Sequence, residues 1–128
     1  MEENTWEDCL SNYSAISTTP DLHKAKALMD TADSRTEAMS KIPTNSGYLS
    51  IVFENYYSSS MEYVQALAIV HGLKITNHVC LGYFLRDVLT KKKLFRIFDK
   101  CRRDRNSIVY YGKQLPHDIP RLRIESLS

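Results

Sequence analysis

Apolar residues recur at intervals of three and four along most of this chain, which is the spacing of a helix that buries one face. The first such segment starts at Ser17–Pro20, where hydroxyl side chains and a proline are typical of a helix start, and ends at Pro43. The second runs from about residue 46 to His71, with Gly72 in the position of a C-terminal stop. No segment alternates apolar and polar residues over the length of a strand, so we expect no strands.

Two further helices complete the pattern. One is expected from an N-cap at Thr76 or Asn77 to Leu89, and the other from Leu94 to Tyr111, after a short basic connection at residues 90–93. Because short connections between long helices favour antiparallel neighbours, the expected fold is an all-α, antiparallel up-and-down four-helix bundle. The bundle is expected to span residues 17–115. Before it lies an N-terminal arm (1–16), either a short helix or irregular, and after it an irregular C-terminal tail (116–128).

Several classes of protein are not expected. The longest uncharged run in the apolar middle, residues 63–73, has 11 residues, against about 20 for a membrane-spanning helix. The N-terminus is acidic and shows no secretory signal. The three cysteines, Cys9, Cys80 and Cys101, are an odd and widely separated set, so we expect buried thiols, no disulfide framework and a reducing cytoplasm.

Metal and cofactor sites are not expected either. The four histidines lie far from paired carboxylates and are expected at the surface or at helix ends. The chain has no glycine-rich phosphate loop, so no cofactor follows from its motifs.

Charge is distributed unevenly along the chain. Residues 1–62 hold 4 basic and 10 acidic residues, whereas residues 63–128 hold 13 basic and 5 acidic ones. Most of the basic excess lies between Arg86 and Lys113. Such a segment is either a solvated helix face or a surface that attracts phosphate.

The fourth expected helix carries the candidate site. It places arginines, which bind phosphate with two parallel hydrogen bonds, beside a carboxamide and two phenol rings that can stack on bases. The candidate RNA- or nucleotide-binding residues are Lys100, Arg102, Arg103, Arg105, Asn106, Tyr110 and Tyr111. The alternative is an exposed basic stripe, paired with Asp99 and Asp104, that binds nothing.

Two stretches of this chain resemble the HEPN family (higher eukaryotes and prokaryotes nucleotide-binding domain), in its small prokaryotic type. The first, YYSSSMEYVQALAIVHGLKITNHVCLGYFL (56–85), resembles the family's long apolar helix with its His-Gly-Leu stop and the helix start that follows. The second, FDKCRRDRNSIVYYG (98–112), resembles the fourth-helix signature, in which an arginine and a polar residue precede a histidine. The resemblance covers about residues 20–115.

The resemblance implies a function as well as a fold. Many relatives are dimeric, metal-independent ribonucleases of toxin–antitoxin or defence systems. Some pair with a small nucleotidyltransferase, and others have lost activity and bind RNA or nucleotide. It therefore implies a homodimer, with RNA, a nucleotide or a small nucleotidyltransferase as partner. Arg105, Asn106 and Tyr110 are the positions that match the catalytic motif.

The chain departs from the motif at one position. The catalytic histidine would fall at residue 110, where this chain has tyrosine. Cleavage through the 2′-hydroxyl of RNA needs a group that both accepts and donates protons near pH 7; histidine, with a pKa of about 6.5, does so, whereas tyrosine, at about 10, stays protonated. His117 could replace it only from the tail, where precise positioning is poor.

Three hypotheses follow. The first is a HEPN-like module that binds RNA or nucleotide with a degenerate ribonuclease motif, which leaves enzymatic activity uncertain. The second is an active metal-independent ribonuclease toxin in which Arg105 stabilises the phosphorane. The third is a non-catalytic protein-interaction bundle.

Overall fold

The protein is mostly helical. The computed structural model describes residues 3–43 and 47–111, with side chains as far as Arg105. Helices make up most of the described residues, which confirms the all-α class. The helices and strands, in order, are α1 (Trp6–Ser11), β1 (Ala15–Ser17), α2 (Leu22–Ser40), α3 (Leu49–Val70), β2 (Leu73–Ile75), α4 (His78–Tyr83), the π-helix η1 (Phe84–Val88) and α5 (Lys92–Tyr111).

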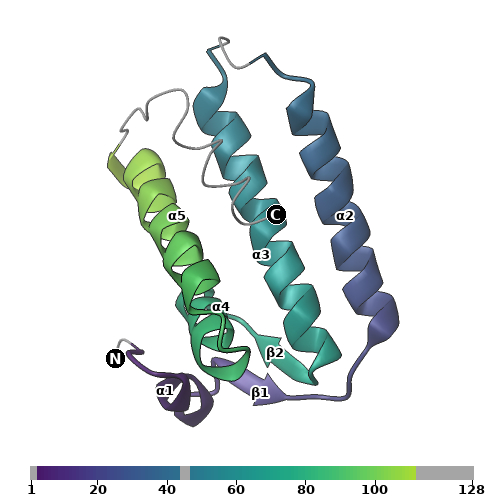
Figure 1. The fold of residues 1–128 in the computed structure, drawn as a ribbon, viewed down its shortest axis with the longest axis vertical. Helices are drawn as coiled ribbons and strands as arrows, with labels where there is room; N and C mark the ends of the chain where they lie inside the picture. Colours follow the sequence, from purple (N-terminus) through teal and green to yellow (C-terminus); the bar gives the residue numbers. More distant parts are fainter. Residues whose placement is uncertain (1–2, 44–46, 112–128) are drawn as a thin grey trace.

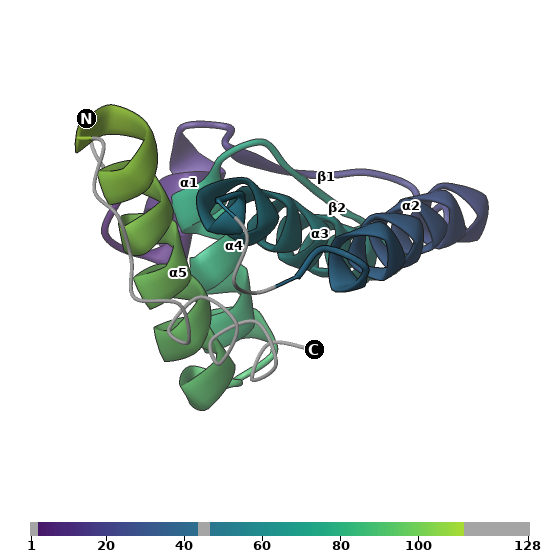
Figure 2. The ribbon, with the colours of Figure 1, turned by 90° about the horizontal axis from the view of Figure 1, so that it is seen from above.

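Helix α3 occupies the middle of the molecule. It forms an antiparallel hairpin with α2, and on its other side it contacts α4 and α5 (Figure 1). Seen from above, α2 lies at one end of the row and α5 at the other, with α3 and α4 between them (Figure 2). Helix α3 ends where the sequence predicts, directly before the stop at Gly72. His71 is the C-cap, and Gly72 follows with a φ of +73°, a conformation that glycine adopts without strain.

The main core lies where α3, α4, η1 and α5 meet. Its largest fully buried side chains are Phe53, Tyr57, Leu81, Phe84 and Phe98. A second, smaller cluster of Ala25, Ala66 and Ile69 joins α2 to α3. Two of the three are alanines, whose small side chains take up little space between the helices. The consequence is that α3 is buried along two opposite sides.

The expectation of no strands is wrong. β1 and β2 pair antiparallel, with Ala15 opposite Ile75 and Ser17 opposite Leu73. Each strand has three residues, which is too short for an alternating pattern to be visible in the sequence. The pairing places the N-terminal arm beside the connection between α3 and α4.

The expectation of three reduced cysteines is also wrong. Cys9 of α1 and Cys80 of α4 form a disulfide, with 6.0 Å between their Cα atoms, and Cys101 is buried outside this bond. The two partners are 71 residues apart, so only the folded chain brings them together. Disulfides are rare in reducing compartments, so this bond does not favour the cytoplasmic location that the sequence led us to expect.

The third expected helix begins as predicted but continues differently. Asn77 is its N-cap, and the side-chain oxygen accepts hydrogen bonds from the N–H groups of Val79 (2.8 Å) and Cys80 (3.2 Å). After Tyr83 the helix widens into η1, and Thr90, with a φ of +55°, turns the chain into α5. Among the described helices, none is long and apolar enough to cross a membrane.

Candidate functional site on α5

Helix α5 separates the predicted basic residues onto two faces. Lys100 and Arg103 are exposed, the latter with 64% of its side chain accessible. Arg102 and Arg105 are mostly covered, at 22% and 23%, and lie on the side of α3 and α4. The seven residues singled out from the sequence therefore do not form one surface.

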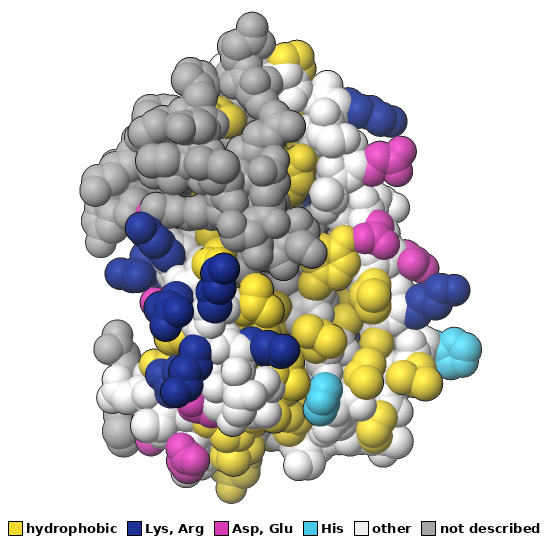
Figure 3. All heavy atoms as spheres, viewed as in Figure 1, with side chains coloured by type: hydrophobic (Ala, Val, Ile, Leu, Met, Phe, Trp, Pro, Cys, Tyr) yellow, Lys and Arg dark blue, Asp and Glu magenta, His cyan; other side chains and the backbone are white. Residues whose placement is uncertain are grey.

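The exposed face extends further than the sequence indicated. We call its five exposed basic residues the basic stripe: Lys92, Lys93, Arg96, Lys100 and Arg103. After the adjacent pair at its start, they follow one another at intervals of three or four residues. Figure 3 shows these dark blue side chains gathered over α5. Because α5 begins at Lys92, two lysines expected in the connection belong to the helix. At 1.5 Å per residue, the stripe spans about 16 Å.

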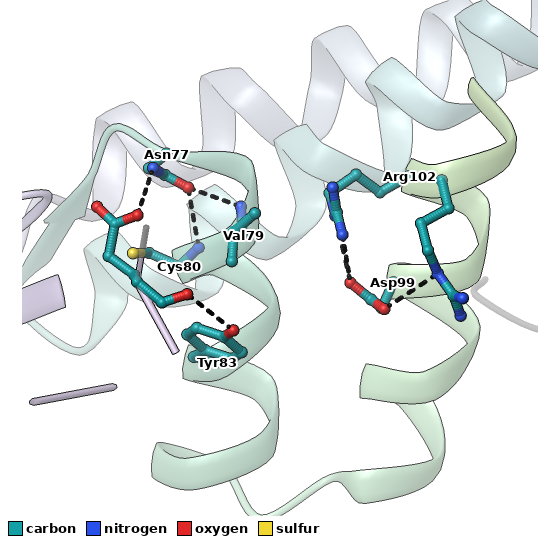
Figure 4. Close-up of polar contacts among 8 residues, drawn as sticks. Asn77, Val79, Cys80, Tyr83, Asp99 and Arg102 are labelled. Carbon is teal, nitrogen blue, oxygen red and sulfur yellow. Dashed lines mark hydrogen bonds and ion pairs between the residues drawn. The ribbon is translucent and has the colours of Figure 1, made fainter. Parts of the chain in front are cut away.

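The acidic side chain of Asp99 borders the stripe. Asp99 lies between Arg102, at 3.0 Å, and Arg103, at 3.4 Å (Figure 4). It partly neutralises Arg103 and holds Arg102 against the helix. Within the described residues, the other four side chains of the stripe form no ion pair.

The covered face of α5 contributes to a second group of polar side chains. We call it the inner cluster: Glu54, Tyr57, His78, Arg102 and Arg105, from α3, α4 and α5. Arg105 Nε lies 3.2 Å from both carboxylate oxygens of Glu54. The His78 ring packs edge-on against Tyr57 with 6.1 Å between centroids, and Tyr57 in turn contacts Phe98. Three helices therefore bring an imidazole, a carboxylate, a phenol and two guanidiniums together.

The environment changes the acidity of both rings. Partial burial lowers the pKa of His78, and the nearby Arg105 and Arg102 guanidiniums lower it further, against the opposing effect of Glu54. Burial raises the pKa of Tyr57, although the same two arginines oppose that shift. At pH 7 the inner cluster therefore holds a neutral imidazole beside two cations.

His78 is held by its position in the chain. It is the first residue of α4, directly after the N-cap Asn77, whose side-chain N–H lies 3.4 Å from Glu3 Oε2. The backbone oxygen of Glu3 also accepts a hydrogen bond from the Tyr83 hydroxyl (Figure 4). The arm, through Glu3 and the Cys9–Cys80 disulfide, thus fixes the start of α4. Sequence reasoning placed His78 at a helix end without assigning it to the site, because only the packing of α4 on α3 brings it to Tyr57.

The remaining predicted residues lie outside what the structure describes. Asn106, Tyr110 and Tyr111 fall in α5 beyond its last described side chain, and His117 falls in the undescribed residues 112–128. No group of three or more metal-ligating side chains is found in the described part of the chain.

Tyr57 offers a direct test of this packing. Its hydroxyl is buried and has no hydrogen-bond partner among the described residues, and a buried hydroxyl without a partner costs about 1–3 kcal/mol. We therefore expect Tyr57→Phe to raise the free energy of unfolding by about 1 kcal/mol, measured by urea denaturation. Tyr63→Phe is the matched control: its hydroxyl donates to the Asp33 carboxylate, so its loss should lower stability. Equal changes in both variants would contradict the assignment.

Comparisons with protein-family models, with curated proteins and with solved structures found no match to this chain.

Proposed function

We propose that this protein is a HEPN-like module that binds RNA or a nucleotide through α5. The observation that carries the proposal is the basic stripe. Its five cations lie on one face of one helix. The length over which they extend fits the backbone of a polyanion better than a single small anion. Of the chain's 15 acidic residues, ten lie in residues 1–62, so α5 belongs to the half of the sequence with a basic excess.

The proposal includes the finer architecture that the HEPN resemblance implies. In it, α2, α3, α4 with η1, and α5 are the four helices of an up-and-down bundle, and the ribonuclease motif is degenerate because Tyr110 stands where histidine is expected. The first alternative function is an active metal-independent ribonuclease toxin. The second alternative is a non-catalytic protein-interaction bundle. A small nucleotidyltransferase is the proposed protein partner.

The homodimer is part of the same proposal. Exposed apolar side chains gather over α2 and α3, where Figure 3 shows a group of yellow side chains. The most exposed large apolar side chains of these two helices are Leu22, Met29, Ile51, Leu67 and Val70. Groups of this kind on a small protein mark contact surfaces more often than solvent-facing ones.

Neutralising the stripe tests the proposed function. A variant with Lys92, Arg96, Lys100 and Arg103 changed to Gln should bind single-stranded RNA at least 100-fold more weakly at low salt. Each lost phosphate contact removes about 0.7 from the slope of log K against log salt, so the slope should fall by about 3. Fluorescence anisotropy with a labelled oligonucleotide, at several salt concentrations, measures both.

The control carries the same loss of charge elsewhere. Lys24, Lys26, Lys41 and Lys74 are exposed and lie outside α5, on or next to α2 and in β2. Changing all four to Gln should leave most of the affinity intact. If both variants weaken binding equally, the attraction is general charge and not α5. If the native protein does not bind RNA or nucleotide at all, the proposed function is wrong.

A further inference from the structure

A groove of about 370 Å³ lies between α2, α3 and β2. Lys24 and Leu28 line it from α2, Gln65 and Ile69 line it from α3, and residues 73–76 line it from β2 and the position after it. We propose that this groove binds an extended segment of a partner protein, with alternating apolar and acidic residues, that adds to β2 as a third, antiparallel strand. The proposal is independent of RNA binding, because none of the lining residues belongs to α5.

The hydrogen-bond pattern of the sheet leaves one edge of β2 open. Thr76 N–H donates to the Ser14 oxygen at 2.9 Å, in line with the antiparallel pairing of β1 and β2. Because alternate residues of an antiparallel strand face the partner strand, Lys74 also directs its main-chain groups to β1, whereas Leu73 and Ile75 direct theirs to the opposite edge. Within the described residues, the N–H and C=O groups on that edge have no main-chain hydrogen-bond partner. An edge of this kind is a template for a further strand.

The groove lies along this open edge. Consecutive residues of a strand point their side chains to opposite faces of a sheet, yet all of residues 73–76 line the groove and none of the described residues of β1 does. The groove therefore borders the edge of β2 that is turned away from β1. In both ribbon views β2 lies between β1 and α3 (Figure 1, Figure 2). A third strand would extend the sheet over α3 in the direction of α2.

The walls of the groove determine which side chains fit. Ile75 is 5% exposed and belongs to the main core, so the face of the sheet that holds Leu73 and Ile75 is turned toward the helices. Partner side chains opposite these two residues lie on the same face, beside Leu28 and Ile69, and should be apolar. The partner residue opposite Lys74 points to the other face, and side chains are closest in such a non-hydrogen-bonded pair. An acidic residue fits there.

Charge favours an acidic segment over a second copy of this chain. Lys24 and Lys74 are exposed, and neither forms an ion pair within the described residues. Two β2 strands paired edge to edge over their full length would place two Lys74 side chains opposite each other, and directly opposed like charges destabilise a sheet. The lysine therefore disfavours self-pairing of this edge and attracts a segment of opposite charge.

The test uses a fluorescein-labelled peptide, acetyl-Glu-Val-Glu-Val-Glu, whose binding to the native protein is followed by fluorescence anisotropy. N-methylation of both valines removes the N–H groups that donate to β2 and should weaken binding about tenfold or more. N-methylation of the central and last glutamates, whose N–H groups point away from β2, is the matched control and should leave the affinity within about twofold. Lys74→Glu should weaken binding about tenfold, whereas Lys26→Glu, exposed on α2 outside the groove, should not.

Amide exchange followed by NMR locates the bound peptide. It should slow exchange of the Leu73 and Ile75 N–H groups about tenfold or more, with little change at Lys74, which already faces β1. Absence of binding, equal binding of the two N-methylated peptides, or no effect of Lys74→Glu overturns the proposal. So does protection of Leu73 and Ile75 without peptide: if it rises with protein concentration, a second copy covers the edge, and if it does not, the chain itself does. RNA binding through α5 is measured separately and stands or falls on its own.

Discussion

Reduction of the Cys9–Cys80 disulfide is expected to lower the free energy of unfolding by about 4 kcal/mol. The bond closes a loop of 71 residues, and in the chain-entropy model a loop of this size restricts the unfolded chain by about that amount. A domain of this length has a total stability of about 5–15 kcal/mol, so the loss is a large share of it. Urea unfolding with and without dithiothreitol measures the difference.

The same effect should follow from mutation. Cys9→Ser and Cys80→Ser should each match the reduced native protein, and reductant should not change the double variant further. Thiol titration of the denatured native protein should find one free thiol, that of Cys101, out of three cysteines. Three titrated thiols, or equal stability with and without reductant, would contradict the bond.

The disulfide illustrates which features a single sequence cannot predict. Most helix ends were predictable because their signals are local: Gly72 stops α3, and Asn77 caps α4. The expected start of the first helix at residues 17–20 was wrong, because Asp21 caps α2 and Ser17 belongs to β1. The Cys9–Cys80 bond and the β1–β2 pairing instead join segments that lie about 60–70 residues apart in sequence. Neither contact leaves a local pattern, so both depend on the packed fold.

The candidate site likewise combines features that local sequence signals predict with features that depend on the packed fold. The basic residues of α5 could be identified from the sequence alone. Their division into an exposed face and a covered face depends on the residue at which the helix begins. The position of His78 was not readable, because only the packing of α4 on α3 brings its ring to Tyr57. The π-helical turn also has no sequence signal; it arises where Leu89 N–H donates to the Phe84 oxygen at 3.0 Å, five residues back.

Phe84 is the residue of η1 that packs into the core. Removal of its side chain should lower the free energy of unfolding about as much as loss of the disulfide. Its side chain is 0% exposed, and its ring lies 6.1 Å from Trp6 of the arm and 5.8 Å from the His71 ring. Phe84→Ala removes contacts to the arm, to the end of α3 and to the core at once. We expect it to lower the free energy of unfolding by about 3–5 kcal/mol.

Val88→Ala provides the control within the same turn. Val88 is 36% exposed, so its truncation should cost less than about 1 kcal/mol. Urea denaturation of both variants, followed by tryptophan fluorescence from Trp6, measures stability and reports on docking of the arm in one experiment. Because the disulfide still ties α1 to α4 in Phe84→Ala, the arm should stay attached while the surroundings of Trp6 become more polar. A loss equal to that of Val88→Ala would mean that η1 does not anchor the core, and the π-helical turn would then be a consequence of the α5 connection alone.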